Sequence, residues 1–328
     1  MQTGPLLPVS VVTGFLGSGK TTLIGRLLRD PSFARTAVIV NEFGEVGLDH
    51  ALIAGGDETV LALTTGCLCC AVRTDLVATL LDLLARRAAG SVGYDRVLVE
   101  TSGLADPAPI LHALMTDPAL AGSHAVAGVV TLVDALLGEA TLGRHPEARR
   151  QVALADRLVL TKTDLAAPAP ALLAALRGLN MLAPLAVGAP DPALLLAPAP
   201  RLGAVPAGVA RHGAGISTFL VERAAPVPAL ALTLWLQALA EHCGERLLRM
   251  KGMVDVAEMP GRPAVIHGVQ HVFAEPDWLD RWPDADRRSR VVFIVQALEG
   301  RAMPPHFPAR LLDAIVAEVA DEQARAAG

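Results

Sequence analysis

A glycine-rich segment close to the N-terminus constrains the fold of this chain more than any other feature. Residues 14–21 read Gly-Phe-Leu-Gly-Ser-Gly-Lys-Thr and match the phosphate-binding pattern G-x-x-x-x-G-K-[ST]. A buried strand is predicted over residues 8–13 and an amphipathic helix over residues 21–29, so strand, loop and helix occur in the order that a P-loop requires. We therefore predict a nucleoside-triphosphate site; a glycine-rich turn that matches by chance is the alternative.

Each residue type in this pattern has a defined task at the phosphates. The glycines let the loop turn its backbone N–H groups toward the β-phosphate. Lys20 is expected to reach the β- and γ-phosphate oxygens, and the Thr21 hydroxyl is expected to bind Mg²⁺. The residues predicted to hold the nucleotide in this segment are Gly14, Gly17, Ser18, Gly19, Lys20, Thr21 and Thr22.

The composition excludes several classes of protein. Hydrophobic residues make up 52% of the 328 residues and aromatic residues 3%, so the mean hydropathy of +0.44 reflects small aliphatic side chains. The longest apolar stretches are too short to span a bilayer and the N-terminus lacks the features of a secretory signal, so we expect a cytoplasmic protein. The net charge of −5 argues against a nucleic-acid or anionic-membrane partner.

An acidic loop follows the second predicted strand. The strand is expected over residues 37–40, and the acidic loop (residues 41–50) contains Glu42, Glu45 and His50. In open parallel sheets, ligands bind beyond the carboxyl ends of the strands, so this loop should lie beside the phosphates and the metal. A solvated acidic turn is the alternative.

Three of the four cysteines, Cys67, Cys69 and Cys70, stand together before an amphipathic helix predicted over residues 74–87. A helix N-terminus favours the thiolate, which is both a nucleophile and a ligand for soft metals. Three sulfurs cannot complete a Cys₄ site, so carboxylates or a histidine must complete it, and the acidic loop is the nearest supplier in sequence. Three buried structural cysteines are the alternative.

A strand predicted over residues 96–99 leads into Glu100, and Gly103 follows three residues later, which is an E-x-x-G switch pattern. Glu100 should face Mg²⁺ through water, and the Gly103 N–H could sense the γ-phosphate, so that this loop changes on hydrolysis. The residues predicted to act in hydrolysis are Lys20, Thr21, Glu100 and Gly103.

The strand predicted over residues 157–160 ends in a Thr-Lys-Thr-Asp tetrapeptide that should bind the base through Thr161, Lys162 and Asp164. The Asp164 carboxylate can accept hydrogen bonds from N1–H and N2–H₂ of guanine, whereas adenine offers an acceptor at N1 and nothing at C2. We therefore predict GTP rather than ATP as the nucleotide; an aspartate that merely caps a helix is the alternative.

The order of the predicted elements changes along the chain. Strands and helices alternate in the first part, which requires an α/β fold with a doubly wound, mostly parallel sheet. Its other predicted elements are strands over residues 60–63, 125–133 and 183–187 and helices over residues 106–115, 146–155 and 171–179. We predict a P-loop GTPase domain over residues 1–200, a linker over 201–215 and a smaller α+β domain over 216–328.

In the second part, turns rather than helices separate most strands, which points to an antiparallel sheet. Helices are predicted over residues 228–249 and 308–326, and strands over residues 216–222, 254–258, 264–273 and 290–298. His267 and His271 would share one strand face as ordinary sheet histidines, and Cys243 would serve packing.

These motifs together closely resemble those of the CobW-type family of P-loop metallochaperone GTPases, closest to its YjiA branch. The likeness is carried by residues 14–21, 41–49, 66–70, 100–103 and 161–164, and it extends to residues 247–252 and 268–270. The resemblance implies slow GTP hydrolysis, binding of Zn²⁺ or a neighbouring ion such as Co²⁺ or Ni²⁺ at the cysteines, and transfer of that ion to a client protein. This chain lacks a His-rich stretch and has Thr161 where asparagine is more usual.

The motifs and the resemblance together suggest which residues bind metal and which partners to expect. The predicted metal ligands are Thr21, Glu42, Glu45, Cys67, Cys69, Cys70 and Glu100. The partners expected are GTP or GDP and a client metalloprotein, and homodimerisation is left open. Two other functions stay open: a small-molecule P-loop kinase, for which no Arg-bearing lid is evident, and a nucleotide-gated binding module without meaningful turnover.

Overall fold

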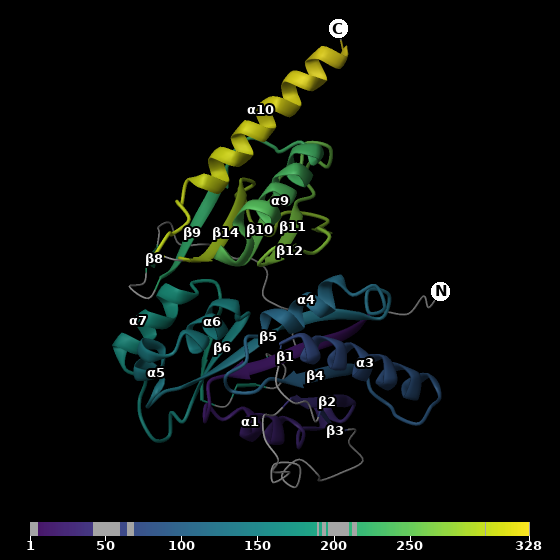
Figure 1. Cartoon of the computed structure of the whole chain (residues 1–328), viewed down its shortest axis with the longest axis vertical. Coiled ribbons are helices and arrows are strands. Elements are labelled where there is room, and N and C mark those ends of the chain that lie inside the picture. The colour runs from purple at the N-terminus through teal and green to yellow at the C-terminus, as the bar shows by residue number, and fades with distance from the viewer. Residues whose placement is uncertain are drawn as a thin grey trace. The chain divides into compact units, whose positions relative to one another are not determined.

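The computed structural model describes residues 6–41, 60–63, 69–188, 190–191, 195, 210–211, 215–298 and 300–327. Two compact units make up the chain (Figure 1). The N-terminal unit comprises Met1–Leu176 and Ala183–Pro200, and the C-terminal unit comprises Arg177–Leu182 and Arg201–Gly328.

The N-terminal unit is built on a sheet of parallel strands in the order β3-β2-β4-β1-β5-β6-β7. The strands are β1 (Leu7–Gly14), β2 (Thr36–Asn41), β3 (Val60–Leu63), β4 (Arg96–Glu100), β5 (His124–Asp134), β6 (Arg157–Thr161) and β7 (Leu185–Val187). The central strands are apolar runs whose side chains are buried on both faces, as expected for a parallel sheet.

Helices cover both faces of this sheet, with α1 on one side and α4 and α6 on the other (Figure 1). The helices are α1 (Lys20–Leu27), α3 (Cys69–Ala88), α4 (Ala108–Thr116), α5 (Gly138–Arg144), α6 (Pro146–Leu154) and α7 (Pro170–Leu179), with a 3₁₀ turn η1 (Pro31–Phe33). Leu23, Ile24 and Leu27 of α1 are buried against the sheet. The doubly wound fold predicted from the alternation of strands and helices is confirmed.

The registers of the strands place their carboxyl ends at one edge of the sheet. Val12 of β1 pairs with Glu100 of β4, and Gly14 at the end of β1 pairs with Leu132 of β5. Asp134 at the end of β5 pairs with Thr161 at the end of β6. The P-loop, the E-x-x-G loop and the Thr-Lys-Thr-Asp segment therefore leave the sheet at the same edge.

The C-terminal unit contains an antiparallel sheet in the order β12-β11-β10-β14-β9-β8, and β13 also pairs with β11. Its strands are β8 (Ala210–Arg211), β9 (Ile216–Arg223), β10 (Leu247–Val254), β11 (Ala264–Val269), β12 (Val272–Phe273), β13 (Asp277–Trp278) and β14 (Ser289–Gln296). Its helices are α9 (Ala229–Cys243), η2 (Gly244–Arg246) and α10 (Phe307–Ala327).

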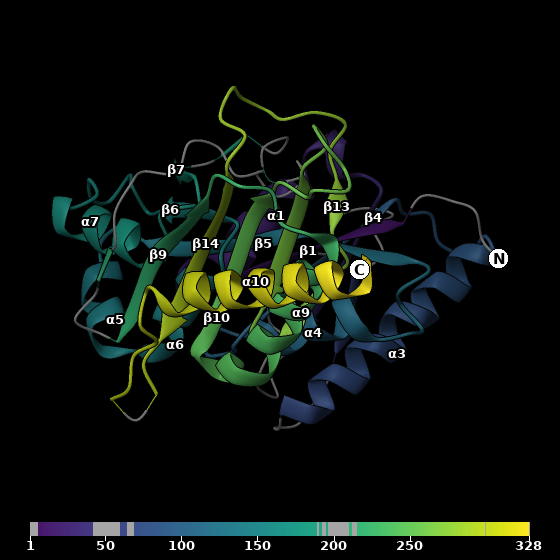
Figure 2. The ribbon, with the colours of Figure 1, turned by 90° about the horizontal axis from the view of Figure 1, so that it is seen from above.

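The two long helices of this unit pack on one face of its sheet, and α10 crosses the strands (Figure 2). Trp235 of α9 is fully buried, and its indole N–H donates to the Pro308 carbonyl at 2.9 Å. Phe219 and Phe293 stack beneath it with ring centroids 5.3 Å apart. Cys243 belongs to the same core, and burial raises the pKa of its thiol to about 11, which confirms its predicted packing role.

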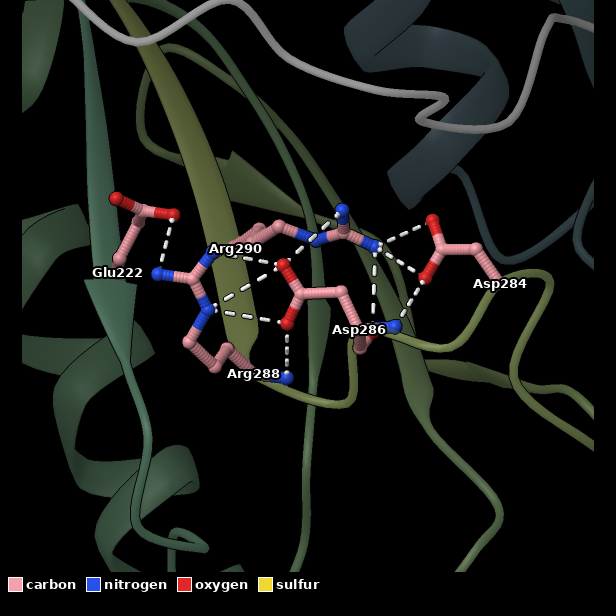
Figure 3. Close-up of polar contacts among 5 residues, drawn as sticks. All are labelled: Glu222, Asp284, Asp286, Arg288 and Arg290. Carbon is pink, nitrogen blue, oxygen red and sulfur yellow. Dashed lines mark hydrogen bonds and ion pairs between the residues drawn. The ribbon is translucent and has the colours of Figure 1, made fainter.

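A cluster of charged side chains fixes the segment before β14 to the sheet (Figure 3). Arg290, whose side chain is 7% exposed, lies 3.0 Å from Asp284. Arg288 lies 2.7 Å from Asp286 and 3.2 Å from Glu222 of β9. The hydrogen bond from Arg288 holds the pKa of the Asp286 carboxyl well below its usual range, so these pairs stay ionised at neutral pH.

Four expectations for the C-terminal unit were wrong. The helix predicted over residues 228–249 ends at Cys243, because Gly244 (φ 48°) turns the chain and Leu247–Val254 then forms β10. Residues 255–258 follow β10 and form no strand. Residues 264–273 form two strands rather than one, because Gln270 (φ 52°) lies in a tight turn between them. His271 lies in that turn, so it does not share a strand face with His267.

In the N-terminal unit, α3 begins at Cys69, five residues earlier than predicted, so Cys69 and Cys70 lie in its first turn rather than before it. No glycine or proline separates Cys69 from the predicted start, so nothing in that stretch interrupts the helix. Helix α5 was not predicted. Within the described part of the chain, no helix is long and apolar enough to cross a membrane.

Candidate nucleotide site

The predicted P-loop lies between β1 and α1 and has the backbone that such a loop needs. Gly17 and Gly19 have φ angles of 73° and 92°, in the left-handed region that L side chains rarely adopt. A Cβ on Gly14 would lie 2.5 Å from the Leu132 carbonyl oxygen. Successive residues in such conformations turn backbone N–H groups toward a common point, which creates an anion-binding concavity at the start of α1.

Lys20 is the first residue of α1, and its side chain folds back over the loop. The residue is 8% exposed, and Nζ donates to the Gly14 carbonyl at 2.9 Å and to the Phe15 carbonyl at 3.4 Å. These bonds hold a positive charge at the loop, where it adds to the partial positive charge of the helix N-terminus. The loop and Lys20 thus form a cationic site for an anion.

The two predicted magnesium ligands are in contact. The Thr21 hydroxyl donates to Glu100 Oε1 at 3.0 Å, although the residues are far apart in sequence. Glu100 is 5% exposed, at the end of β4. A hydroxyl and a carboxylate oxygen are the hard ligands that Mg²⁺ prefers, so these two side chains fit a magnesium ion held beside the phosphates.

The E-x-x-G loop lies directly against the P-loop. A Cβ on Gly103 would lie 2.7 Å from the Leu16 backbone nitrogen, so only glycine allows this approach. The loop is anchored where it leaves β4, because the Thr101 hydroxyl donates to Thr13 Oγ1 at 2.7 Å and the Thr101 N–H donates to the Val12 carbonyl at 3.0 Å. A small movement of this loop must therefore displace the P-loop as well.

The Thr-Lys-Thr-Asp segment contacts the P-loop through its first residue. The Thr161 hydroxyl donates to the Ser18 carbonyl at 2.8 Å, which ties the predicted base loop to the phosphate loop. Lys162 has a φ of 56°, unusual for a residue other than glycine, and its Nζ lies 2.6 Å from Asp134 Oδ2. Asp164 is exposed in the following turn, where its carboxylate is accessible to a base.

Asp134 is ionised at neutral pH. Burial acts to raise the pKa of its carboxyl, but hydrogen bonds from Lys162 and from the backbone N–H groups of Leu137 and Leu136 outweigh burial and lower the pKa. Asp134 therefore fixes both the ammonium group of Lys162 and the start of the α5 segment.

The arrangement fits a magnesium-bound nucleoside triphosphate. The structure brings together nearly all residues predicted at the phosphates and at the base loop, namely Gly14, Gly17, Ser18, Gly19, Lys20, Thr21, Glu100, Gly103, Thr161 and Lys162. Ser18 Oγ is buried and has no hydrogen-bond partner among the described residues, so a donor or acceptor is free at the loop. Thr22 is exposed on the first turn of α1.

The predicted site for a transferred metal is only partly described. Cys69 and Cys70 lie in the first turn of α3, and their side chains are outside the described residues, as are Cys67, Glu42, Glu45 and His50. Among the residues that the structure does describe, no group of three or more His, Cys, Asp or Glu side chains could hold a metal ion. The metal ligands therefore stay a prediction.

Sequence reasoning assigned no role to two polar residues beside the site. Asp134, the partner of Lys162, stands at the end of a buried parallel strand, where polar residues often reach a ligand. Gln151 is fully buried on α6 and bonds to the E-x-x-G loop. The sequence could have pointed to Gln151, because it is a glutamine on the apolar face of a short helix. Buried polar side chains are rare and normally have a hydrogen-bond partner.

A glycine-rich loop after the first parallel strand, with a lysine over it and a threonine–carboxylate pair beside it, defines a P-loop nucleoside-triphosphate-binding protein. Residues 8–185 match the family described as CobW/HypB/UreG, nucleotide-binding domain, and residues 216–311 match the cobalamin synthesis protein cobW C-terminal domain. The chain belongs to this family, which confirms the resemblance predicted from the motifs.

Individual relatives agree with this assignment. The chain is 34% identical over 303 residues to the zinc chaperone YjiA of Escherichia coli (strain K12), covering 88% of this chain and 93% of the relative. It is 37% identical over 195 residues to the zinc chaperone CobW of Pseudomonas aeruginosa, covering 50% of this chain and 51% of the relative. The crystal structure of Zn(II)-bound YjiA GTPase from E. coli matches with a TM-score of 0.74 and 27% identity over 95% of this chain and 99% of that chain.

Proposed function

We propose that the protein is a GTPase that binds Zn²⁺, or a related ion such as Co²⁺ or Ni²⁺, and delivers it to a client metalloprotein. The observation that carries the proposal is the bond between Thr21 and Glu100 at 3.0 Å beside Lys20, in a chain similar along most of its length to a zinc chaperone. This geometry supports phosphate chemistry, and the named relatives support metal delivery as its purpose.

The residues of the P-loop would act mainly by position and charge. The N–H groups of the loop and the Lys20 ammonium group would bind the phosphate oxygens, and Thr21 and Glu100 would hold Mg²⁺. When bound, Mg²⁺ neutralises charge that develops on the phosphates. No arginine-finger-type assistance is evident in the sequence, so slow unassisted turnover is expected, far below the usual enzyme median of about 10 s⁻¹.

Guanine selection is proposed for the loop after β6. Asp164 would accept hydrogen bonds from the base, Lys162 would pack beside it, and Thr161 would keep this loop in register with the P-loop through Ser18. Thr161 thus supplies a link to the phosphate loop even though asparagine is more usual at this position. The preference should lie with GTP, because adenine offers no N–H at N1 for the carboxylate.

The transferred ion would be the cargo of the protein, not a part of its catalytic machinery. We propose that Cys69, with one or both of Cys67 and Cys70 and a carboxylate from Glu42 or Glu45, binds it, because thiolates select soft or borderline ions. Glu100 begins a loop expected to respond to the γ-phosphate, and the cysteines and the acidic loop precede it in sequence. Cytoplasmic location, homodimerisation, the absence of a nucleic-acid partner and the domain limits 1–200, 201–215 and 216–328 stay predictions.

Product analysis tests the proposed activity against its alternatives. Untagged protein is incubated with Mg²⁺ and GTP or ATP, and inorganic phosphate, nucleoside diphosphate and any other phosphorylated product are quantified. The proposal predicts stoichiometric phosphate and GDP, slowly, with GTP preferred over ATP. A phosphorylated small molecule would identify a kinase, and tight GTP binding without phosphate release in the presence of Zn²⁺ would identify a binding module.

A further inference from the structure

Gln151 is a polar side chain buried where the proposed mechanism has so far given it no role. It lies on α6 and is fully buried. Its Nε2 donates to the Gly103 carbonyl at 3.2 Å and to the Ala105 carbonyl at 3.0 Å. Both partners are acceptors, so the orientation of the amide is fixed by its contacts. Both N–H groups of this amide therefore hold the E-x-x-G loop.

The helix that carries Gln151 is itself anchored to the sheet and to the same loop. The Gln151 carbonyl accepts a hydrogen bond from the Thr131 hydroxyl of β5 at 2.8 Å. The neighbouring Arg150 reaches Asp106, at the far end of the loop, at 3.3 Å. The amide of Gln151 is thus presented to the loop from a rigid support.

The same helix also touches the P-loop. His145 directly precedes α6, and its ring centroid lies 4.4 Å from that of Phe15. One short helix therefore contacts both loops that must meet at the γ-phosphate. Its His145 end faces the P-loop, and its Gln151 end holds the loop that contains Gly103.

The glycine at position 103 is the reason why the loop needs support from Gln151. Gly103 packs against the Leu16 backbone because it has no Cβ, and the same lack of a side chain gives it more backbone freedom than any other residue. Fixing the carbonyls of Gly103 and Ala105 holds the peptide planes that follow these two residues, and so limits the movement of the segment that carries the Gly103 N–H. An unrestrained loop would lose conformational entropy each time it bound the γ-phosphate, and this loss would weaken binding.

We propose that Gln151 is a positioning residue that holds the E-x-x-G loop against the P-loop, so that discrimination between GTP and GDP depends on its side-chain amide. The inference rests on the proposed GTPase function and adds a residue from outside the sequence motifs. Gln151 acts through Gly103 and need not touch the nucleotide. A glutamine that merely satisfies two buried carbonyls would affect stability and leave this discrimination unchanged.

Two substitutions separate these roles. Gln151→Leu keeps the approximate size and removes both donors. Gln151→Glu keeps the shape but, when ionised, places a negative charge against two carbonyl oxygens. Affinities for a non-hydrolysable GTP analogue and for GDP are measured by direct titration, together with unfolding by urea. We expect Gln151→Leu to weaken the GTP analogue about ten-fold or more while changing GDP much less.

The glutamate variant adds a pH-dependent readout. Burial and two facing carbonyls should raise the pKa of the new carboxyl, because both disfavour its charged form. Below that pKa the protonated acid can donate to one carbonyl, so the defect of Gln151→Glu should shrink as pH falls from about 8 to about 6. The other titratable groups of α6, of the residue before it and of the loop are shared with the wild type, whose values at each pH are the reference; they are His145, Glu147, Arg149, Arg150, Glu100 and Asp106.

Gln296 provides a matched control in the C-terminal unit. It is 7% exposed, and its Nε2 donates to the Glu245 carbonyl at 2.8 Å, so Gln296→Leu removes a comparable amide bond in the unit that does not contain the P-loop. We expect Gln296→Leu to lower stability without changing the ratio of the two nucleotide affinities. If Gln151→Leu does not fold, Gln151→Glu at low pH carries the same test, since its protonated form keeps one bond.

The outcomes distinguish this inference from the proposed function. Equal loss of GTP-analogue and GDP affinity in Gln151→Leu, or a Gln151→Glu defect that does not depend on pH, would overturn the positioning role while wild-type GTP turnover stands. A wild type that hydrolyses no GTP would instead overturn the proposed function itself. A selective loss for the GTP analogue with relief at low pH supports the role of Gln151.

Discussion

At the scale of single residues, Lys20 is the most direct test of the phosphate site. Lys20→Ala removes the ammonium group that lies over the loop, and we expect GTP turnover to fall about a hundred-fold or more. Arg26→Ala is the matched control, because Arg26 is an exposed cation on the same helix. Phosphate release is measured for both variants; comparable turnover by Lys20→Ala and wild type would show that this loop is not the site of hydrolysis.

A second prediction at the residue scale concerns Asp134. The lowered pKa of its carboxyl determines how its contribution to the free energy of unfolding changes with pH. A carboxyl whose folded pKa lies below the unfolded value of about 3.9 stabilises the fold above that value and loses the contribution as pH falls through the folded pKa. Asp134→Asn should therefore cost about 1 kcal/mol of unfolding free energy near neutral pH, a modest value because Lys162 is partly exposed.

The difference between wild type and Asp134→Asn should then shrink as the solution is acidified below about pH 4. The asparagine oxygen can still accept from the backbone N–H groups of Leu136 and Leu137, so the variant isolates the charge and its bond to Lys162. Urea unfolding at a series of pH values measures this difference. A constant difference across the acidic range would mean that the Lys162 pair does not stabilise the fold.

At the scale of elements, Gly244 decides where the first long helix of the C-terminal unit ends. Its φ of 48° and ψ of −131° are unfavourable for an L side chain, and no described atom lies within 4 Å of an added Cβ. Gly244→Ala should therefore lower the free energy of unfolding by about 1–3 kcal/mol through backbone strain alone.

Gly143 is the matched control for Gly244. It lies within α5 at an ordinary φ, also with open space around an added Cβ, so Gly143→Ala should be neutral or stabilise the protein by up to about 1 kcal/mol. Thermal or urea unfolding of both variants measures the contrast. Equal effects of the two substitutions would show that the backbone at Gly244 is not strained.

The elements also show what the sequence can and cannot predict. Short apolar runs that end in polar residues, such as those before Glu100 and Thr161, were located to within a residue or two. The first three residues of β10 were assigned to the preceding helix, because Leu247 and Leu248 extend its apolar pattern and a short apolar stretch does not by itself separate strand from helix. The bond from Gln151 to Gly103 depends on tertiary packing, which no local pattern reveals.

At the scale of the whole molecule, we expect nucleotide state and metal binding to be coupled. The sequence places three cysteines and an acidic loop before the switch residue Glu100 in the same unit as the P-loop. If the γ-phosphate moves these segments, nucleotide and metal must influence one another, and by linkage each must change the affinity of the other by the same factor. Such coupling would allow a change of nucleotide state to lower the metal affinity of the GTPase, so that the metal ion is released to a client.

The measurement that tests this claim most directly is competition for Zn²⁺ with a chromophoric chelator, in GTP analogue and in GDP. Wild type, Cys69→Ala and Cys243→Ala are compared, because Cys243 is buried with a thiol pKa of about 11 and should bind no metal. We predict different zinc affinities in the two nucleotide states, a strong loss of zinc affinity in Cys69→Ala and no change in Cys243→Ala. Identical zinc affinity in both nucleotide states, or full affinity in Cys69→Ala, would contradict it.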